Sequence, residues 1–441
     1  MKFIKLLFIA IVSLCFVNNS VAQDTEQYTT IPDINFEIAL RDYGYDDYGE
    51  LDGKVPTSNI AKLTVLKIDN RNINDLTGIQ DFAALTDLYC PENKLTSLNL
   101  NNNRALVHLN CSKNRLLTSL DITANANLTT LFCEENLLST LDLRQNINLT
   151  VLRCARNQLA ALDVSKNIAL TDLDCSRNKL TTLDICENIA LIILGCVQDQ
   201  LTTLDVSQNI NLESLYCAEN QLTALDLSKN TSLKYLGCGN NPFKILDLTY
   251  NTALNYLNCM HTPLTDLDIS KNIALTKIYL DENQLTSLDV TRNINLAYLS
   301  CNKNKLTSLK VSNAPLTDLI CYENSLTALD VTQNPALVQF ECSNNQLTNL
   351  DVSKNNALGL FDCSNNQLTN LDVSKNTVLY TFHCKSNRLT SLNIKNGNNK
   401  KLINLYAFFN PDLTCIQADS DIMPPFNWRK DGVASFSTYC E

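Results

Sequence analysis

The chain has 441 residues, a formal charge of −11, only ten Gly and ten Pro, 45% hydrophobic residues and 18% charged residues. An acidic chain with dispersed charge lacks the clustered Lys and Arg that attract nucleic acid or an anionic membrane surface. The apolar fraction excludes a disordered chain.

The first residues are typical of an export signal. Two lysines precede an apolar run from Leu6 to Val17, and small residues up to Ala22 permit cleavage before Gln23. This run is too short to span a bilayer. We therefore expect residues 1–22 to be a signal peptide, and the product to be secreted, periplasmic or on the cell surface, with no transmembrane segment after signal removal.

Residues 23–62 are expected to form an N-terminal cap, because a solenoid must cover its exposed core. Asp33 or Asn35 is placed to cap a short helix that runs through Leu40. The acidic stretch from Asp42 to Gly53 is expected to be a solvated loop, since its spacing matches no EF-hand.

Cysteine then recurs every 20 to 22 residues from Cys90 to Cys384, with Leu280 filling the one gap. Each repeat contains two similar halves, L-x-x-L-x-C-x-x-N and L-x-x-L-D-V-x-x-N, as in the stretch from Leu170 to Ala190. Apolar residues alternate with period two within each half, which predicts a short strand in each. We therefore expect a rod-shaped solenoid over residues 63–410, with about 16 to 17 coils and parallel β-sheet on both long sides.

This repeat resembles that of bacterial leucine-rich repeat proteins of the 21-residue nested kind called IRREKO, and the resemblance covers roughly 80% of the chain. The stretches Ile31 to Leu40 and Asn70 to Leu88 are similar to the cap and first coils of secreted internalin-like proteins. The resemblance implies a right-handed leucine-rich repeat solenoid in an exported protein used for binding or adhesion.

The inward columns have structural explanations. Stacked Cys side chains act as small hydrophobes, and parallel side chains on neighbouring strands do not offer the torsion of a disulfide, so we expect buried free thiols. The sequence contains no C-x-x-C motif and no Cys/His cluster, so a zinc site is not expected. Asn157, Asn178 and Asn220 represent an Asn column that is expected to bond the backbone of the turns, interrupted by Asp199 and Thr262.

The second half of the repeat carries an outward acidic column that includes Asp121, Asp142 and Asp289. Stacked carboxylates repel each other, so they need nearby hydroxyls and N–H groups, a Lys or Arg three residues on, or bound cations. A structural ladder is the favoured interpretation, and a basic partner is a third. The weaker calcium candidates are Asp205, Asp226, Asp247 and Asp268.

The outward positions of the first half are more informative, because they differ from coil to coil. Six successive coils each contribute one tyrosine, in a stretch that also holds His261, Gly237 and Gly239. β propensity alone explains part of this enrichment, but tyrosine among adaptable polar groups is typical of binding surfaces. The candidate ligand-binding residues are Tyr216, Tyr235, Tyr256, Tyr279, Tyr298, Tyr322 and His261.

Catalysis finds little support. The three histidines lie too many coils apart to converge on one substrate, and no nucleophile elbow, P-loop or dinucleotide motif is present. The alternative from another class is a solenoid polysaccharide lyase that uses calcium on the Asp column, with Lys310 as its base. The favoured hypothesis is a monomeric, non-enzymatic binding protein without a cofactor, whose partner is a protein or a glycan.

Residues 411–441 are expected to close the solenoid as a C-terminal cap. Cys415 and Cys440 lie outside the repeat register and enclose enough apolar residues to cover the core. We predict that they form the one disulfide. Cys186 also breaks register, but its column neighbours Ser165 and Ser207 offer no partner, so it should remain a free thiol.

Overall fold

A computed structural model describes residues 26–46, 50–420 and 426–440. The expected signal peptide, and part of the expected acidic loop, lie outside these residues. Within them, no helix combines the length and apolar character that a membrane span requires.

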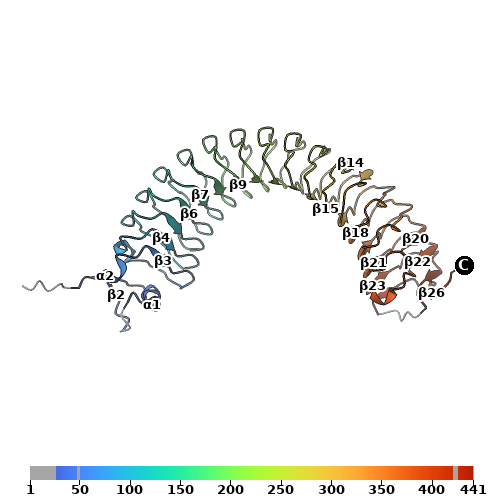
Figure 1. Cartoon of the computed structure of the whole chain (residues 1–441), viewed down its shortest axis with the longest axis horizontal. Coiled ribbons are helices and arrows are strands. Elements are labelled where there is room, and N and C mark those ends of the chain that lie inside the picture. The colour runs from blue at the N-terminus through green and yellow to red at the C-terminus, as the bar shows by residue number, and fades with distance from the viewer. Residues whose placement is uncertain (1–25, 47–49, 421–425, 441) are drawn as a thin grey trace, which may run out of the picture.

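The solenoid is an arc, and one parallel sheet lines its inner side (Figure 1). Each strand of this inner sheet pairs in register with the strand of the next coil, as Leu215 of β10 pairs with Leu236 of β11. The sheet is open, since neighbour pairing runs from β3 to β25 and no ladder joins these two ends among the described residues. Its strands are β3 (Val65–Lys67), β4 (Asp87–Tyr89), β5 (His108–Asn110), β6 (Thr130–Phe132), β7 (Val151–Arg153), β8 (Asp172–Asp174), β9 (Ile193–Gly195), β10 (Ser214–Tyr216), β11 (Tyr235–Gly237), β12 (Tyr256–Asn258), β13 (Lys277–Tyr279), β15 (Tyr298–Ser300), β17 (Asp318–Ile320), β18 (Gln339–Glu341), β19 (Leu360–Asp362), β21 (Thr381–His383), β23 (Asn404–Tyr406) and β25 (Trp428–Arg429).

The structure does not show the second continuous sheet expected from the sequence. The outer side holds a pair, β14 (Ser287–Asp289) with β16 (Ser308–Lys310), and one isolated bridge between Asn99 and Asp121. Near the C-terminus four strands pair, namely β20 (Asn370–Asp372), β22 (Ser391–Asn393), β24 (Cys415–Gln417) and β26 (Ser435–Ser437). Because the arc fans its coils apart on the outer side, most of these segments are extended but too far from their neighbours for a backbone ladder.

Between the two sides lies one hydrophobic core, in which Leu side chains of successive coils stack, together with Cys side chains in most coils. Cys217 and its column neighbours are fully buried free thiols, as predicted. Burial raises the pKa of Cys111 to about 12, so the ladder is uncharged at neutral pH. Asn220 donates from Nδ2 to the carbonyls of Cys196 and Cys217, at 2.7 and 3.1 Å, which confirms the bonding expected for the Asn column.

Asp33 connects the N-terminal cap to the solenoid. Its Oδ1 accepts the N–H groups of Asn35 and Phe36 at the start of α1 (Ile34–Asp42), and its Oδ2 accepts the N–H of Asn74 in the first coil at 2.7 Å. β1 (Tyr28–Thr30) pairs antiparallel with β2 (Lys54–Pro56), which leads into the short α2 (Thr57–Ile60). Single 3-10 turns, η1 (Ile79–Asp81) and η2 (Asn399–Lys401), lie at the two ends of the repeat region.

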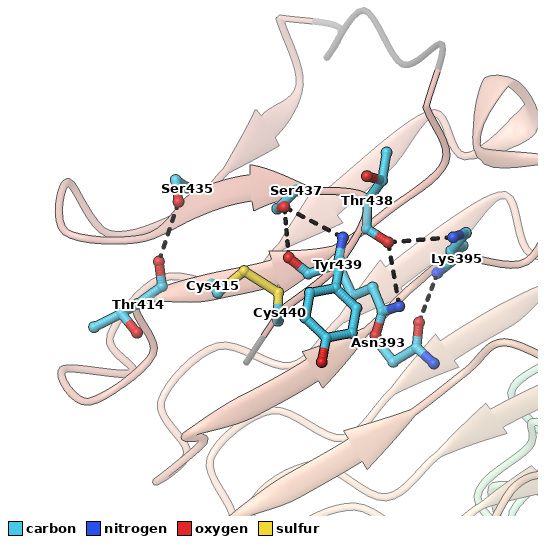
Figure 2. Close-up of a disulfide and its surroundings, with 10 residues drawn as sticks. Asn393, Lys395, Thr414, Cys415, Ser435, Ser437, Thr438, Tyr439 and Cys440 are labelled. Atoms are coloured by element: carbon cyan, nitrogen blue, oxygen red, sulfur yellow. Dashed lines mark hydrogen bonds between the residues drawn. A yellow bond between two sulfur atoms is a disulfide. The ribbon is translucent and has the colours of Figure 1, made fainter.

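The C-terminal cap takes the form of a further coil. β25 extends the inner sheet, β24 and β26 extend the outer one, and Trp428 Nε1 donates to the carbonyl of Leu402 at 2.9 Å. Cys415 and Cys440 form the predicted disulfide, with Cα atoms 5.9 Å apart (Figure 2). Cys186 is an exposed free thiol, also as predicted.

Candidate binding surface

Six tyrosines define what we call the tyrosine surface, on the inner sheet between β10 and β17. Each three-residue strand buries its middle residue and turns the other two outward. Tyr235, Tyr256 and Tyr298 take the first position of their strands, Tyr216 and Tyr279 the third, and Tyr322 follows β17. The pairing register puts Tyr256 beside Lys277, and Lys277 beside Tyr298.

Three of the tyrosines form a ring cluster. The ring centroids of Tyr256 and Tyr279 are 5.6 Å apart and those of Tyr279 and Tyr298 are 4.8 Å apart, with tilted planes. Tyr279 therefore connects two rings of the other column. No ring pair joins Tyr216, Tyr235 or Tyr322 to this cluster among the described residues, so the predicted set divides into a cluster and three separate rings.

A buried carboxylate lies beneath this region. Asp281, which is 5% exposed, accepts hydrogen bonds from Ser300 Oγ and from the N–H of Asn302. Burial raises the pKa of Asp281, against the effect of these donors. Burial, the Tyr279 ring and the nearby Asp281 raise the pKa of Tyr298 to about 12, so its hydroxyl stays protonated and able to donate.

His261 belongs to a row of interacting side chains beside the tyrosines. Its Nδ1 lies 2.9 Å from Glu282 Oε2, and Lys303 Nζ lies 2.8 Å from Glu282 Oε1. All three residues occupy the turn position after the inner strand, where φ is 52 to 55°. The N–H of His261 donates to the next coil at the carbonyl of Asp281, so one backbone geometry aligns these side chains coil after coil.

The two glycines near the tyrosines are explained by close approach. A Cβ at Gly237 would lie 3.2 Å from the ring of Tyr216, and one at Gly239 would lie 2.6 Å from the carbonyl of Met260. The Tyr216 ring thus leans over the next coil. A side chain at Gly239 would collide with the backbone of the following turn.

The Asp column on the outer side is bonded to its own turns. Asp205 Oδ1 accepts the N–H of Ser207 at 2.8 Å, and the same contact recurs in Asp226, Asp247 and Asp268. These backbone and hydroxyl donors hold the pKa of each carboxyl below its usual range. The sequence offered three ways to offset repulsion between the stacked carboxylates. Hydrogen bonds from hydroxyls and N–H groups are the one that recurs in all four of these turns.

Basic partners are found at two points of the Asp column. Arg144 pairs with Asp142 at 2.6 Å and, with the backbone bond, lowers the pKa of that carboxyl to about 2. Lys310, the residue of the lyase alternative, lies 3.4 Å from Asp289. No group of three His, Cys, Asp or Glu side chains suited to a metal ion occurs in the part of the chain that the structure describes.

A second aromatic group on the inner side was missed by the sequence analysis. His383 and Tyr406 stack with centroids 4.4 Å apart, and Phe408 meets both Tyr406 and Phe409 edge-on. Tyr406 lies outside the run of six coils that the tyrosine pattern singles out. This second group combines different aromatic residue types at different positions of neighbouring coils. A search for one residue type at one position does not detect it.

The chain is similar to several solved structures. The functional domain of InlJ from Listeria monocytogenes, which includes a cysteine ladder, is 36% identical, with a TM-score of 0.75 over 83% of this chain and 82% of that one. A leucine-rich repeat protein of Leptospira interrogans is 24% identical, with a TM-score of 0.61 over 82% and 91%. YopM from Yersinia enterocolitica is 24% identical, with a TM-score of 0.60 over 80% and 74%. No protein-family model and no curated protein sequence matches the chain.

Proposed function

Because the chain belongs to the family of bacterial leucine-rich repeat proteins that includes the internalins, we propose that it is an exported, non-enzymatic binding or adhesion protein. Proteins of this kind typically bind other proteins. The ligand, a protein or a glycan, docks on the tyrosine surface. The observation that carries this proposal is the ring cluster of Tyr256, Tyr279 and Tyr298 on a solvent-facing sheet.

The ring cluster suits binding for a physical reason. Tyrosine presents a large apolar area with few rotatable bonds, and neighbouring rings restrain each other, so little conformational entropy is lost when a ligand docks. The row of His261, Glu282 and Lys303 borders the cluster and adds polar contacts that orient a partner. Exposed Tyr216 and Tyr235 extend the apolar area along the sheet.

The first experiment identifies a ligand and then removes the cluster. A glycan array and a pull-down from the envelope of the host organism supply the ligand, and surface plasmon resonance measures its affinity. The triple substitution Tyr256→Ser, Tyr279→Ser and Tyr298→Ser should weaken binding at least a hundredfold, since aromatic anchors contribute about 2 kcal/mol each at interface centres. The matched control is Tyr250→Ser, at a tyrosine that is 56% exposed and lies away from the inner sheet.

Equal affinity of the triple variant and wild type would reject this surface as the binding site. The far-UV spectrum and the melting temperature should stay close to wild type, because all three side chains lie outside the Leu and Cys core. Ionic strength then separates the two ligand classes. A glycan bound by tyrosine responds little to salt, whereas a protein that contacts Glu282 and Lys303 weakens as salt rises.

A further inference from the structure

Four successive coils carry an exposed isoleucine on the flank of the arc, in the turn that leads from the outer side back to the inner sheet. Each isoleucine is more than half exposed, between 55 and 58%. This run, which we call the isoleucine ridge, consists of Ile147, Ile168, Ile189 and Ile210. The corresponding turn residues on either side are Ala126 and Thr231, so the ridge ends after four coils.

The buried asparagine before each isoleucine fixes its outward direction. Asn167 is fully buried and donates from Nδ2 to the carbonyls of Leu143 and Asn146, at 3.2 and 2.8 Å. Asn188 makes the same bonds one coil further on. With Asn before it and the buried Leu two residues later both turned inward, the isoleucine between them has only solvent to face. A row of four such side chains is an apolar strip with no intramolecular cover.

The sequence around the ridge reads alike in both directions. The exposed residue two positions before each isoleucine is Gln145, Lys166, Glu187 and Gln208 in chain order. The residue after each isoleucine is Asn148, Ala169, Ala190 and Asn211. If these rows are reversed about a point midway between Ile168 and Ile189, each of the residues named here meets a residue of the same type, except that Lys166 meets Glu187.

We propose that the isoleucine ridge is the interface of a two-fold dimer of this chain, with the axis between the coils of Ile168 and Ile189. Two flanks that meet about such an axis run antiparallel, so Ile168 packs on Ile189 of the second copy and Lys166 pairs with Glu187 of the second copy, twice over. A two-fold interface requires this self-complementarity. An axis through the coil of Ile189 is disfavoured, because it would set Glu187 against itself.

Charge also favours a second copy over a different partner. The chain carries a net charge of −11 and would repel itself over most of its surface. In the four ridge coils, however, the exposed row two positions before the isoleucines has no net charge, because it contains one lysine and one glutamate. Neither Lys166 nor Glu187 has an ion-pair partner among the described residues. A dimer here would replace the monomer expected from the sequence, and it leaves the inner sheet of both copies open.

Sedimentation velocity of the folded protein between 1 and 100 µM tests this proposal, because a narrow interface predicts reversible association in about that range. Wild type should shift from monomer to dimer, and Ile168→Asn with Ile189→Asn should remain a monomer. The matched control replaces Ile273 and Ile294, which are as exposed but lie outside the ridge. Their substitution by Asn should leave the dimer unchanged.

Charge reversal tests the register. Lys166→Glu or Glu187→Lys alone should weaken the dimer at least tenfold, and the two together should restore it. Wild type that stays monomeric at 100 µM, a dimer that survives the double isoleucine substitution, or a double reversal that fails to restore association would each overturn the proposal. Circular dichroism verifies that every variant is folded.

Discussion

The inner and outer sides of the arc are built from similar half repeats, yet they differ in what holds their backbone. On the inner side, main-chain N–H and C=O groups bond to the neighbouring coil, as in β10 and β11. Most of the outer side has no such ladder among the described residues, and side chains bond the backbone of their own turn instead, as when Asp226 accepts the N–H of Ser228. Backbone pairing leaves the outward inner positions free to vary, whereas side-chain bonding obliges the outer side to repeat its residues.

The largest effect should come from removing a side chain that bonds the backbone of two coils. Asn220→Leu leaves the carbonyls of Cys196 and Cys217 and the N–H of Leu201 without partners inside the protein. We expect a loss of about 3 to 5 kcal/mol in unfolding free energy, measured by urea denaturation. The contrasting inner-face variant Tyr235→Ser should cost under about 1 kcal/mol. Similar losses in both variants would contradict the comparison.

The disulfide should have the next largest effect, at the end where both sides are paired. Replacing Cys415 and Cys440 by Ser opens a loop with a sequence separation of 25 residues and should cost about 3 kcal/mol. Hydrogen exchange should then speed up in β24 and β26 before it does so in β10 or β11. Uniform exchange along the chain would show that the bond does not protect this end selectively.

Asp199 allows the role of the Asn column to be tested by pH. It occupies a position of this column but, when ionised, has no N–H group to donate to the backbone carbonyls. Its Oδ1 accepts the N–H of Asn178 at 3.0 Å, but the buried Oδ2 has no partner. Burial raises the pKa of Asp199 to about 6, well above the usual carboxyl value. A raised carboxyl pKa means that the protonated form stabilises the fold, fully below about pH 4, and that this contribution is lost as pH rises through 6.

Asp199→Asn restores the missing donor at every pH. It should therefore raise the unfolding free energy by about 1 to 2 kcal/mol at pH 8 and by little at pH 4. Denaturation midpoints at both values measure the difference. Asp226→Asn is the control, because its exposed carboxyl already has donors. A gain that is equal at the two pH values would rule out protonation of Asp199 as its source.

The smallest effect concerns the Asp column and calcium. If turn donors suffice for Asp205 and its neighbours, no calcium is bound, and EDTA should shift the melting temperature by no more than about 1 to 2 °C. Removal of bound calcium would lower the melting temperature further, because a ligand that binds only the folded state stabilises it. A larger fall, reversed by added calcium, would favour bound cations over the structural ladder.

The sequence predicts local features of this molecule better than those that depend on curvature. The disulfide was predictable because Cys415 and Cys440 leave a register that fourteen other cysteines keep. The extent of the outer sheet was not, since L-D-V describes an extended segment and pairing depends on how far the arc spreads its coils. The tyrosines were found as a set, but only the alternation of first and third strand positions shows that Tyr279 joins Tyr256 to Tyr298. The isoleucine ridge was missed because its position varies along the chain: it holds Ala126, Thr231 and Pro335 in other coils, and isoleucine again at Ile273 and Ile294.

The thiol ladder also creates a kinetic competition during folding, between burial of each thiol and its oxidation. In an oxidising compartment every unfolded cysteine is exposed to oxidant, and wrong pairings compete with the native bond. Each coil of a solenoid contacts only its neighbours, so folding closes short loops and propagates coil by coil. Each ladder thiol is therefore buried as soon as the next coil docks. Cys415 begins β24 in the coil before the last, Cys440 follows β26 of the last coil, and both side chains are partly exposed. Once the ladder is buried, these two thiols and the exposed Cys186 are still accessible, and of the three only Cys415 and Cys440 lie close enough to pair.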